Sequence, residues 1–249
     1  MIDRAKFFAG VRSSPFDGSL SQGQVAGMEA ILSAAPPDLP LMHLAYCLAT
    51  VFHETATTML PIKERGGPDY FHRMYDPKGS RPSVAADLGN IFPGDGAKFA
   101  GRGYVQLTGR SNYARAARIT GEDLVDCPDL AMRHDLAARI MFDGMTKGWF
   151  TGRKLADYFG AKADPVEARR IINRLDCADV IARHYRNFLA ALRTADKSEL
   201  IATATSTRPR AAAPPAPPAA PPPARLVESA PKKGFFSSLF RGLSAINRS

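Results

Sequence analysis

The chain has 249 residues, 45% of them hydrophobic, which is enough for one well-packed core and a small appendage. No stretch approaches the roughly 18 consecutive apolar residues of a membrane-spanning helix, so we expect no membrane span. The net charge of +9 is uneven, because seven bases and one acid lie from Thr207 onward (+6), which leaves +3 for residues 1–206. We therefore expect no nucleic-acid binding by the main domain, whereas the tail is basic.

The N-terminal sequence MIDRAKFFAGVRSS has no apolar segment of the kind that a secretory signal peptide contains. We expect synthesis in the cytoplasm and action on the cell wall or periplasm only after release. Cys47, Cys127 and Cys177 are an odd number of widely spaced cysteines. They are expected to be buried free thiols, not a disulfide or a metal site.

Residues 1–206 are predicted to form a mainly α-helical domain. Ser21 is a plausible N-cap for a helix with Val25, Met28 and Leu32 on one face. Apolar residues at helical spacing predict further helices in four stretches: DLPLMHLAYCLATVFHET, DLAMRHDLAARIMFDGMTKGWF, DPVEARRIINRL and CADVIARHYRNFLAALRTA.

Residues 57–110 are rich in Gly, Pro, Asp and Arg, and we expect a long irregular segment there. Within it YVQLT alternates like a short strand, and GDG (94–96) and GRG (101–103) are expected to make tight turns. Long loops on a rigid frame are typical of binding and catalytic sites. This segment is therefore the expected wall of a cleft.

The C-terminal part divides in two. Residues 207–231 form a predicted linker, with seven prolines between positions 211 and 223 that favour an extended polyproline-type spacer. Residues 232–249 combine apolar residues at helical spacing with four bases, which is typical of a basic amphipathic helix. Contact with a membrane or anionic envelope, docking on the domain and simple disorder all stay open for this tail.

The sequence HET at 53–55 first invites comparison with a zinc motif. A metalloprotease H-E-x-x-H would need a second histidine at position 57, which is Thr57. No other histidine has matching spacing, and no G-x-S-x-G motif is present. We therefore expect no metal, no other cofactor and no nucleophilic serine.

Two glutamates remain as candidates for acid–base chemistry. Glu54 follows an apolar helical stretch, where burial would raise its pKa and keep it protonated. Glu64 stands among Lys63, Arg65 and two glycines, a polar setting that would favour its ionised form. Two carboxyls with separated pKa values are the acid and the base that glycoside hydrolysis requires. The alternative is a pair of solvated surface charges.

The arrangement of several blocks resembles the glycoside hydrolase family 19 chitinases, and in particular their phage and bacterial endolysin-like relatives. The matching blocks appear in family order over roughly residues 40–200. They are HET, the ERG that follows it, GRGYVQLTGRSNY, DCPDL and RRIINRLDCADVIARHYRNF. The resemblance implies a lysozyme-like helical domain over residues 1–206 and metal-free hydrolysis of β-1,4 bonds in an N-acetylated amino-sugar polymer.

The resemblance also implies roles for individual residues. Glu54 matches the general acid and Glu64 the general base that activates water on the opposite sugar face. Thr108 matches a residue that helps to hold this water, and Gln106 and Asn112 match side chains that bind the sugar. The implied mechanism inverts the anomeric centre, with the two carboxyls about 6.5–9.5 Å apart.

Further residues are secondary candidates. Asn173 matches an asparagine that faces the cleft, and Tyr104 and Tyr113 either line the cleft or pack in the core. His53 either hydrogen-bonds near the acid or packs behind it. Arg102, like Arg65, either tunes Glu64 or is a surface charge.

The substrate stays open between two polymers that share a β-1,4 backbone with N-acetyl groups. The cysteine-rich chitin-binding module of many plant relatives is not present in the sequence, and the loops look short, so peptidoglycan is a serious candidate beside chitin. A cell-wall-degrading endolysin, a chitinase acting on chitin oligomers and a non-catalytic sugar-binding relative are the three hypotheses. In each case we expect a monomer.

Overall fold

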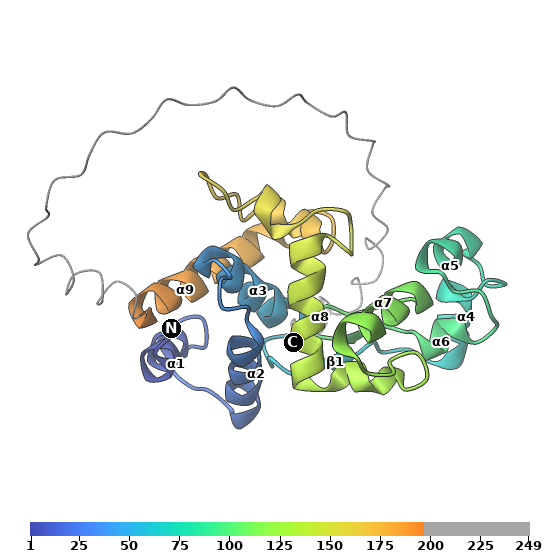
Figure 1. The fold of residues 1–249 in the computed structure, drawn as a ribbon, viewed down its shortest axis with the longest axis horizontal. Coiled ribbons are helices and arrows are strands. Elements are labelled where there is room, and N and C mark those ends of the chain that lie inside the picture. The colour runs from blue at the N-terminus through green and yellow to red at the C-terminus, as the bar shows by residue number, and fades with distance from the viewer. Residues whose placement is uncertain (197–249) are drawn as a thin grey trace, which may run out of the picture.

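The computed structural model describes residues 1–196, so the predicted linker (207–231) and tail (232–249) lie outside the described residues. The predicted mainly helical, lysozyme-like architecture is confirmed (Figure 1). None of the helices within residues 1–196 is long and apolar enough to cross a membrane.

Nine α-helices and three short 3-10 helices make up most of residues 1–196, with two strands of two residues each. The α-helices are α1 (Arg4–Ser13), α2 (Gln22–Ala34), α3 (Leu41–Glu54), α4 (Pro68–Tyr75), α5 (Pro82–Leu88), α6 (Asp95–Lys98), α7 (Arg110–Thr120), α8 (His134–Lys147) and α9 (Ala178–Ala195). The strands β1 (Ile62–Lys63) and β2 (Arg102–Gly103) pair antiparallel. The 3-10 helices are Pro128–Met132, Leu155–Asp157 and Glu167–Ile171.

Local sequence explains where α2 begins and why α3 is buried. Ser21 caps α2 as predicted and forms a reciprocal capping box with Gln24, which satisfies two backbone N–H groups that would otherwise lack partners. Helix α3 is buried on nearly all sides. A helix that is apolar all round belongs in the centre of a core, and α3 packs along the length of α9.

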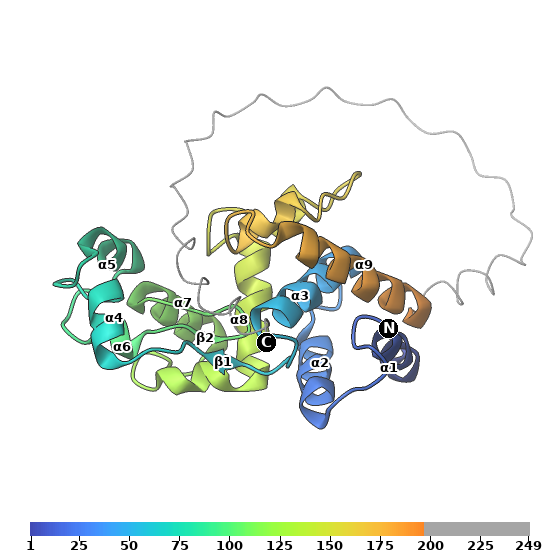
Figure 2. The same ribbon diagram turned by 180° about the vertical axis from the view of Figure 1, so that it is seen from behind.

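The fold has two hydrophobic cores. The larger one gathers residues of α1, α2, α3, α8 and α9, and a smaller one contains Phe71, Tyr75, Val84, Leu88 and Ala100. In Figure 1, α4, α5 and α6 form a small lobe at one end of the molecule, and α1 and α9 lie at the other end. Figure 2 shows β1 and β2 running between the small lobe and α2 and α3.

Three expectations are corrected. The stretch YVQLT is not a strand: Tyr104–Gln106 form a turn, because every side chain there is buried and Gln106 adopts a positive φ of 53°. The segment 57–110 is not wholly irregular, since it contains α4, α5 and α6. Cys47 is a buried free thiol as expected, but Cys127 is exposed and Cys177 is half-buried.

Candidate active site

Glu54 is the last residue of α3 and is almost completely buried, with 2% of its surface exposed. Its carboxylate forms an ion pair with the guanidinium of Arg169, which is equally buried and comes from the 3-10 helix Glu167–Ile171. Nη1 of Arg169 donates to Oε1 of Glu54. The C-terminal end of α3 and a segment more than a hundred residues later therefore meet at this carboxylate.

The setting of Glu54 differs from the one expected. The sequence predicted an apolar wall beside this carboxyl, whereas the structure places a cation there, because α3 and the 3-10 helix converge. Arg169 also donates from Nε to the carbonyl of Asp176 at 3.0 Å. Its Nη2 and the hydroxyl of Tyr46 are both buried without a hydrogen-bond partner within residues 1–196. A buried guanidinium with a free N–H group is thus available beside Glu54.

Glu64 follows β1 and is bound at both its backbone and its side chain. Its N–H donates to the carbonyl of Gly101 at 2.8 Å, and the N–H of Gly101 donates to Oε2 at 3.1 Å. Oε1 accepts a hydrogen bond of 2.8 Å from the hydroxyl of Tyr75 and one of 3.3 Å from Tyr70. Three donors thus hold the carboxylate in one orientation.

The pKa of Glu64 is raised above its ordinary value, because burial disfavours the charged form. The hydrogen bonds from Gly101, Tyr75 and Tyr70 act in the opposite direction and limit the rise. The sequence predicted a polar, flexible setting with an ionised carboxyl. That prediction is wrong in its cause, since Arg65 is exposed and the groups that contact Glu64 are neutral donors.

Tyr75 connects Glu64 to the small lobe. This tyrosine is fully buried in the smaller core, and its carbonyl accepts a hydrogen bond of 2.9 Å from Nδ2 of Asn90. Oδ1 of Asn90 in turn accepts from the N–H of Arg110 at 2.8 Å. The orientation of Glu64 therefore depends on the packing of α4 and on the start of α7.

The turn after β2 carries Gln106 and Thr108 beside Glu64. Nε2 of Gln106 donates to the carbonyl of Ile62 at 2.9 Å, and Oγ1 of Thr108 donates to the carbonyl of Gln106 at 2.8 Å. A Cβ atom on Gly101 would lie 2.8 Å from Oε1 of Gln106 and 3.2 Å from Oε2 of Glu64. Glycine at 101 thus allows both side chains to approach the same backbone.

Asn112 and Asn173 sit on separate elements. Asn112, half-buried on α7, donates from Nδ2 to the carbonyl of Thr108 at 2.8 Å, so it belongs to the same cluster as the turn. Asn173 is buried just after the 3-10 helix that carries Arg169, and its Oδ1 accepts from the N–H of Arg174 at 2.8 Å. The structure therefore groups Asn173 with Glu54, and Asn112 with Glu64.

Of the two alternatives that the sequence left open for Tyr104, a substrate-binding position in the cleft and packing in the core, the structure shows packing in the core. It is fully buried, and its hydroxyl contacts the carbonyl of Gly27 at 3.3 Å and Nδ1 of His134 at 2.7 Å. Tyr113 is also fully buried and donates to the carbonyl of Ala100 at 2.9 Å. Both rings pack in the larger core.

Arg102 does not contact Glu64 either. Its Nε donates to Oδ1 of Asp129 at 2.6 Å, and Nη1 donates to the carbonyl of Ala100 at 2.9 Å and to the hydroxyl of Tyr113 at 3.1 Å. Since Ala100 precedes Gly101, Arg102 fixes the backbone to which Glu64 is bonded. Arg102 therefore acts on Glu64 by holding this backbone in place and not as a neighbouring charge.

His53 is half-buried beside Glu54. Burial lowers its pKa, an effect that the charge of Glu54 opposes. His184 of α9 lies close by, with its ring centroid 4.7 Å from that of Phe52. Burial lowers the pKa of His184 to about 4, with smaller contributions from His53 and Arg183. Two largely neutral imidazoles are therefore expected behind Glu54 near neutral pH.

Sequence reasoning missed three site residues: Arg169, Tyr70 and Tyr75. The stretch RRIIN was recognised only for Asn173, and an arginine amid apolar residues, which predicts a buried charge needing a partner, was the available signal for Arg169. No local signal marks the two tyrosines. Within residues 1–196, no group of three or more His, Cys, Asp or Glu side chains is arranged to hold a metal ion.

The comparisons with known proteins agree with this geometry. The family model for class I chitinases, glycoside hydrolase family 19, matches residues 43–182, which span both glutamates, the turn with Gln106 and Asn173. This match covers more than half of the chain. The chain therefore belongs to the class I chitinase family, and it is a glycoside hydrolase with a polysaccharide substrate.

The solved structure of one chitinase shares the fold. Chitinase C from Streptomyces griseus HUT6037 is 19% identical, with a TM-score of 0.51 over 77% of this chain and 76% of that one. A bacterial family 19 chitinase is 22% identical, with a TM-score of 0.46 over 77% of this chain and 94% of that one. No curated protein gives a match.

Proposed function

We propose that this protein hydrolyses β-1,4 bonds of an N-acetylated amino-sugar polymer by an inverting mechanism, with Glu54 as general acid and Glu64 as general base. The observation that carries the proposal is the fixed orientation of the Glu64 carboxylate by Tyr75, Tyr70 and Gly101. A base that activates water has to be held in place before the substrate arrives.

The environment of Glu64 suits a base. Burial raises its pKa, which strengthens it as a proton acceptor, and the hydrogen bonds from three neutral donors favour the ionised form that a base requires. Thr108 and Gln106 lie on the adjoining turn, where they support the water and the sugar in this proposal.

The proposed role of Glu54 as general acid requires one further step. A general acid has to hold a proton when the sugar is bound, whereas Glu54 is in contact with the Arg169 guanidinium. In this proposal the entering sugar loosens that contact, and Glu54 takes up a proton from the solvent and donates it to the glycosidic oxygen as the glycosidic bond breaks. Glu64 removes a proton from a water molecule, which attacks the anomeric carbon from the opposite face. Arg169 then stabilises the carboxylate that remains on Glu54.

The substrate that we propose is peptidoglycan, cleaved by the protein as a cell-wall-degrading endolysin. The net charge of +9 supports it, because bacterial cell envelopes are anionic whereas chitin is a neutral polymer. In this proposal the enzyme is made in the cytoplasm, reaches the wall after release and acts as a monomer, and its basic tail contacts the anionic envelope.

A second candidate is a chitinase acting on chitin oligomers, which the description of the matching family favours. Product masses after digestion of purified sacculi and of chitin hexamer distinguish the two. Muropeptides released from sacculi by the wild type, and not by Glu64→Gln, support the endolysin. Activity on chitin alone removes it, and no turnover of either polymer favours a non-catalytic sugar-binding protein.

A further inference from the structure

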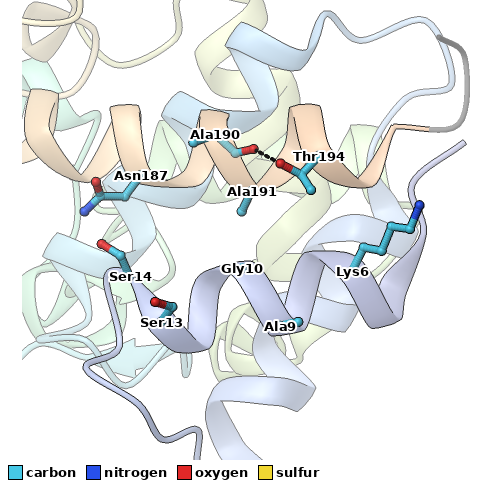
Figure 3. A pocket seen from close by; sticks show the side chains of 9 residues that line it. All are labelled: Lys6, Ala9, Gly10, Ser13, Ser14, Asn187, Ala190, Ala191 and Thr194. Carbon is cyan, nitrogen blue, oxygen red and sulfur yellow. Dashed lines mark hydrogen bonds between the residues drawn. The ribbon is translucent and has the colours of Figure 1, made fainter.

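A groove runs between α1 and α9, at the opposite end of the domain from the small lobe (Figures 1 and 3). Its volume is about 460 Å³, and none of the candidate active-site residues lines it. Figure 3 shows short side chains along both walls of what we name the α1/α9 groove. The lining residues are Lys6, Ala9, Gly10, Ser13 and Ser14 from the first wall and Asn187, Ala190, Ala191 and Thr194 from the second.

The shape of the groove follows from close helix packing. A Cβ atom on Gly10 would lie 3.0 Å from Cβ of Ala191, so glycine lets the two helices approach at this point. Ala9 and Ala190 leave the space above the contact open, and Ser13, Asn187 and Thr194 supply polar groups. The result is a narrow trough with small walls and several hydrogen-bonding side chains.

Positive charge is concentrated on the two helices that form this trough, whose lining includes Lys6, although Arg4 is paired with Glu29. Helices α1 and α9 together contain six bases and one acid, a net charge of +5, whereas residues 1–206 as a whole carry only +3. The bases are Arg4, Lys6, Arg12, Arg183, Arg186 and Arg193, and the acid is Asp179. The rest of the domain therefore has a net negative charge, and the excess of base is concentrated on this pair of helices.

The arginines of α9 lie along the groove. Arg183 precedes Asn187 by four positions, so it is on the same helix face one turn earlier, and Arg186 and Arg193 flank Ala190 by four and three positions. All three are exposed. Within residues 1–196, neither these arginines nor Lys6 forms an ion pair with an acid, in contrast to Arg102, Arg110 and Arg133.

We infer that the α1/α9 groove is an accessory binding site for a linear polyanionic glycan, a polysaccharide strand that carries carboxylate or phosphate groups. Unpaired exposed cations attract an anionic partner. The hydroxyl and amide side chains of the trough are suited to sugar hydroxyls. A second copy of this chain that docked through the same two helices would present the same +5 surface, and the tail segment 232–249 carries four bases, so both would be repelled.

Other anionic partners fit the surface less well. The lining of the groove has no aromatic side chain, whereas sites for single-stranded nucleic acids stack bases on aromatic rings. It also has no large apolar side chain of the kind that inserts into a lipid interface. The exposed bases beside the trough, together with the hydroxyl and amide groups in its lining, therefore favour the glycan.

The test measures binding of the full-length protein to polygalacturonate, a linear carboxylated glycan, by isothermal titration calorimetry at constant ionic strength. The triple variant Arg183→Gln/Arg186→Gln/Arg193→Gln should bind about tenfold more weakly, because three exposed charge contacts are lost. The matched control Arg118→Gln/Arg153→Gln/Lys162→Gln removes the same charge from exposed positions outside the groove. It should bind as the wild type does.

A second pair of variants separates the groove from diffuse charge. Ala190→Tyr fills the trough without altering charge and should also weaken binding, whereas Ala156→Tyr, at an exposed alanine elsewhere, should not. Equal losses in the two charge variants, or no effect of Ala190→Tyr, would overturn the proposal. So would tighter groove-dependent binding of oligothymidylate or of phosphatidylglycerol vesicles than of polygalacturonate.

The proposal of an accessory site rests on different measurements from the proposal of hydrolysis, so either can be disproved without the other. Turnover of a short neutral chitin oligomer should be the same in the wild type and in all four variants, because none of the altered side chains contacts Glu54 or Glu64. A variant that loses this turnover while retaining polygalacturonate binding would contradict the separation of the two sites and, with it, the accessory role of the groove.

Discussion

The hydroxyl of Tyr75 donates a hydrogen bond of 2.8 Å to Oε1 of Glu64, and Tyr75 is itself fully buried in the small lobe. This bond favours the ionised carboxyl, since a donor stabilises negative charge. We predict that Tyr75→Phe raises the pKa of Glu64 further, because one hydrogen bond to the charged form of the carboxyl is lost. The acidic limb of the kcat/KM profile should then move to higher pH.

Tyr70 provides the matched comparison, because its hydrogen bond to the same oxygen is longer, at 3.3 Å. Tyr70→Phe should shift the acidic limb in the same direction by a smaller amount. Superimposable pH profiles for the wild type and Tyr75→Phe would show that this hydrogen bond does not control the base.

The two proposed roles can be separated by the leaving group. Glu54→Gln should lower turnover of the polymer by about 10²–10⁴, the usual contribution of a general acid. A dinitrophenyl glycoside needs no protonation of its leaving oxygen, so this variant should lose far less activity on it. Glu64→Gln should lose activity on both substrates, because water activation is needed in each case.

Rates on the two substrates, measured for both variants under the same conditions, check this assignment. The reverse pattern, in which the activated substrate rescues Glu64→Gln, would exchange the two roles. Two observations would be consistent with that outcome. Glu54 contacts a cation, which favours an ionised base, and Glu64 has a raised pKa, which favours an acid.

Gly101 is expected to be intolerant of any side chain. A Cβ atom there would lie 3.2 Å from Oε2 of Glu64 and 2.8 Å from Oε1 of Gln106, both closer than ordinary contact. Gly101→Ala should displace the carboxylate and lower kcat by about 10²-fold, the effect of a misplacement of about 1 Å. Gly160→Ala, where a Cβ atom meets nothing within 4 Å, should leave kcat unchanged.

The sequence allowed prediction of those elements whose pattern is local. Amphipathic or apolar spacing predicted α2, α3 and α9, and Ser21 marked the start of α2 through its own side chain. Helices α1 and α7 were not predicted. In α7 only Tyr113, Ala116 and Thr120 are buried, so the apolar face is too weak a signal.

The candidate site was harder to predict, because its contacts join distant parts of the chain. The resemblance selected Glu54 and Glu64, but their partners depend on packing. Arg169 is 115 positions from Glu54, and Gly101 is 37 positions from Glu64. Charges adjacent in sequence, such as Arg65, were poor guides to the groups adjacent in space, and so the expected surroundings were wrong for both carboxyls.

The buried ion pair between Glu54 and Arg169 has a consequence for stability. Removing one partner leaves an uncompensated charge in the core, which costs about 3–5 kcal/mol. Arg169→Met should therefore lower the free energy of unfolding by about this amount, as measured by urea denaturation. The double variant Glu54→Gln/Arg169→Met removes both charges and should recover much of the loss.

The exposed pair of Arg170 and Glu167 is the control, because it lies in the same 3-10 helix. Arg170→Met should change stability by about 1 kcal/mol or less, as for other surface ion pairs. Additive losses from the two single changes at Glu54 and Arg169 would show that the pair is not coupled.

His184 should make the protein less stable in mild acid. Burial lowers its pKa from 6.5 to about 4, so between these values the unfolded chain binds a proton that the folded protein does not. The contribution of neutral His184 to the free energy of unfolding is therefore fully present above pH 6.5 and is lost as the pH falls toward 4. Glutamine is neutral throughout, so His184→Gln should flatten the decline in unfolding free energy over this range. Urea denaturation at several pH values measures the slope, and equal slopes for the two proteins would mean that His184 protonates freely in the fold.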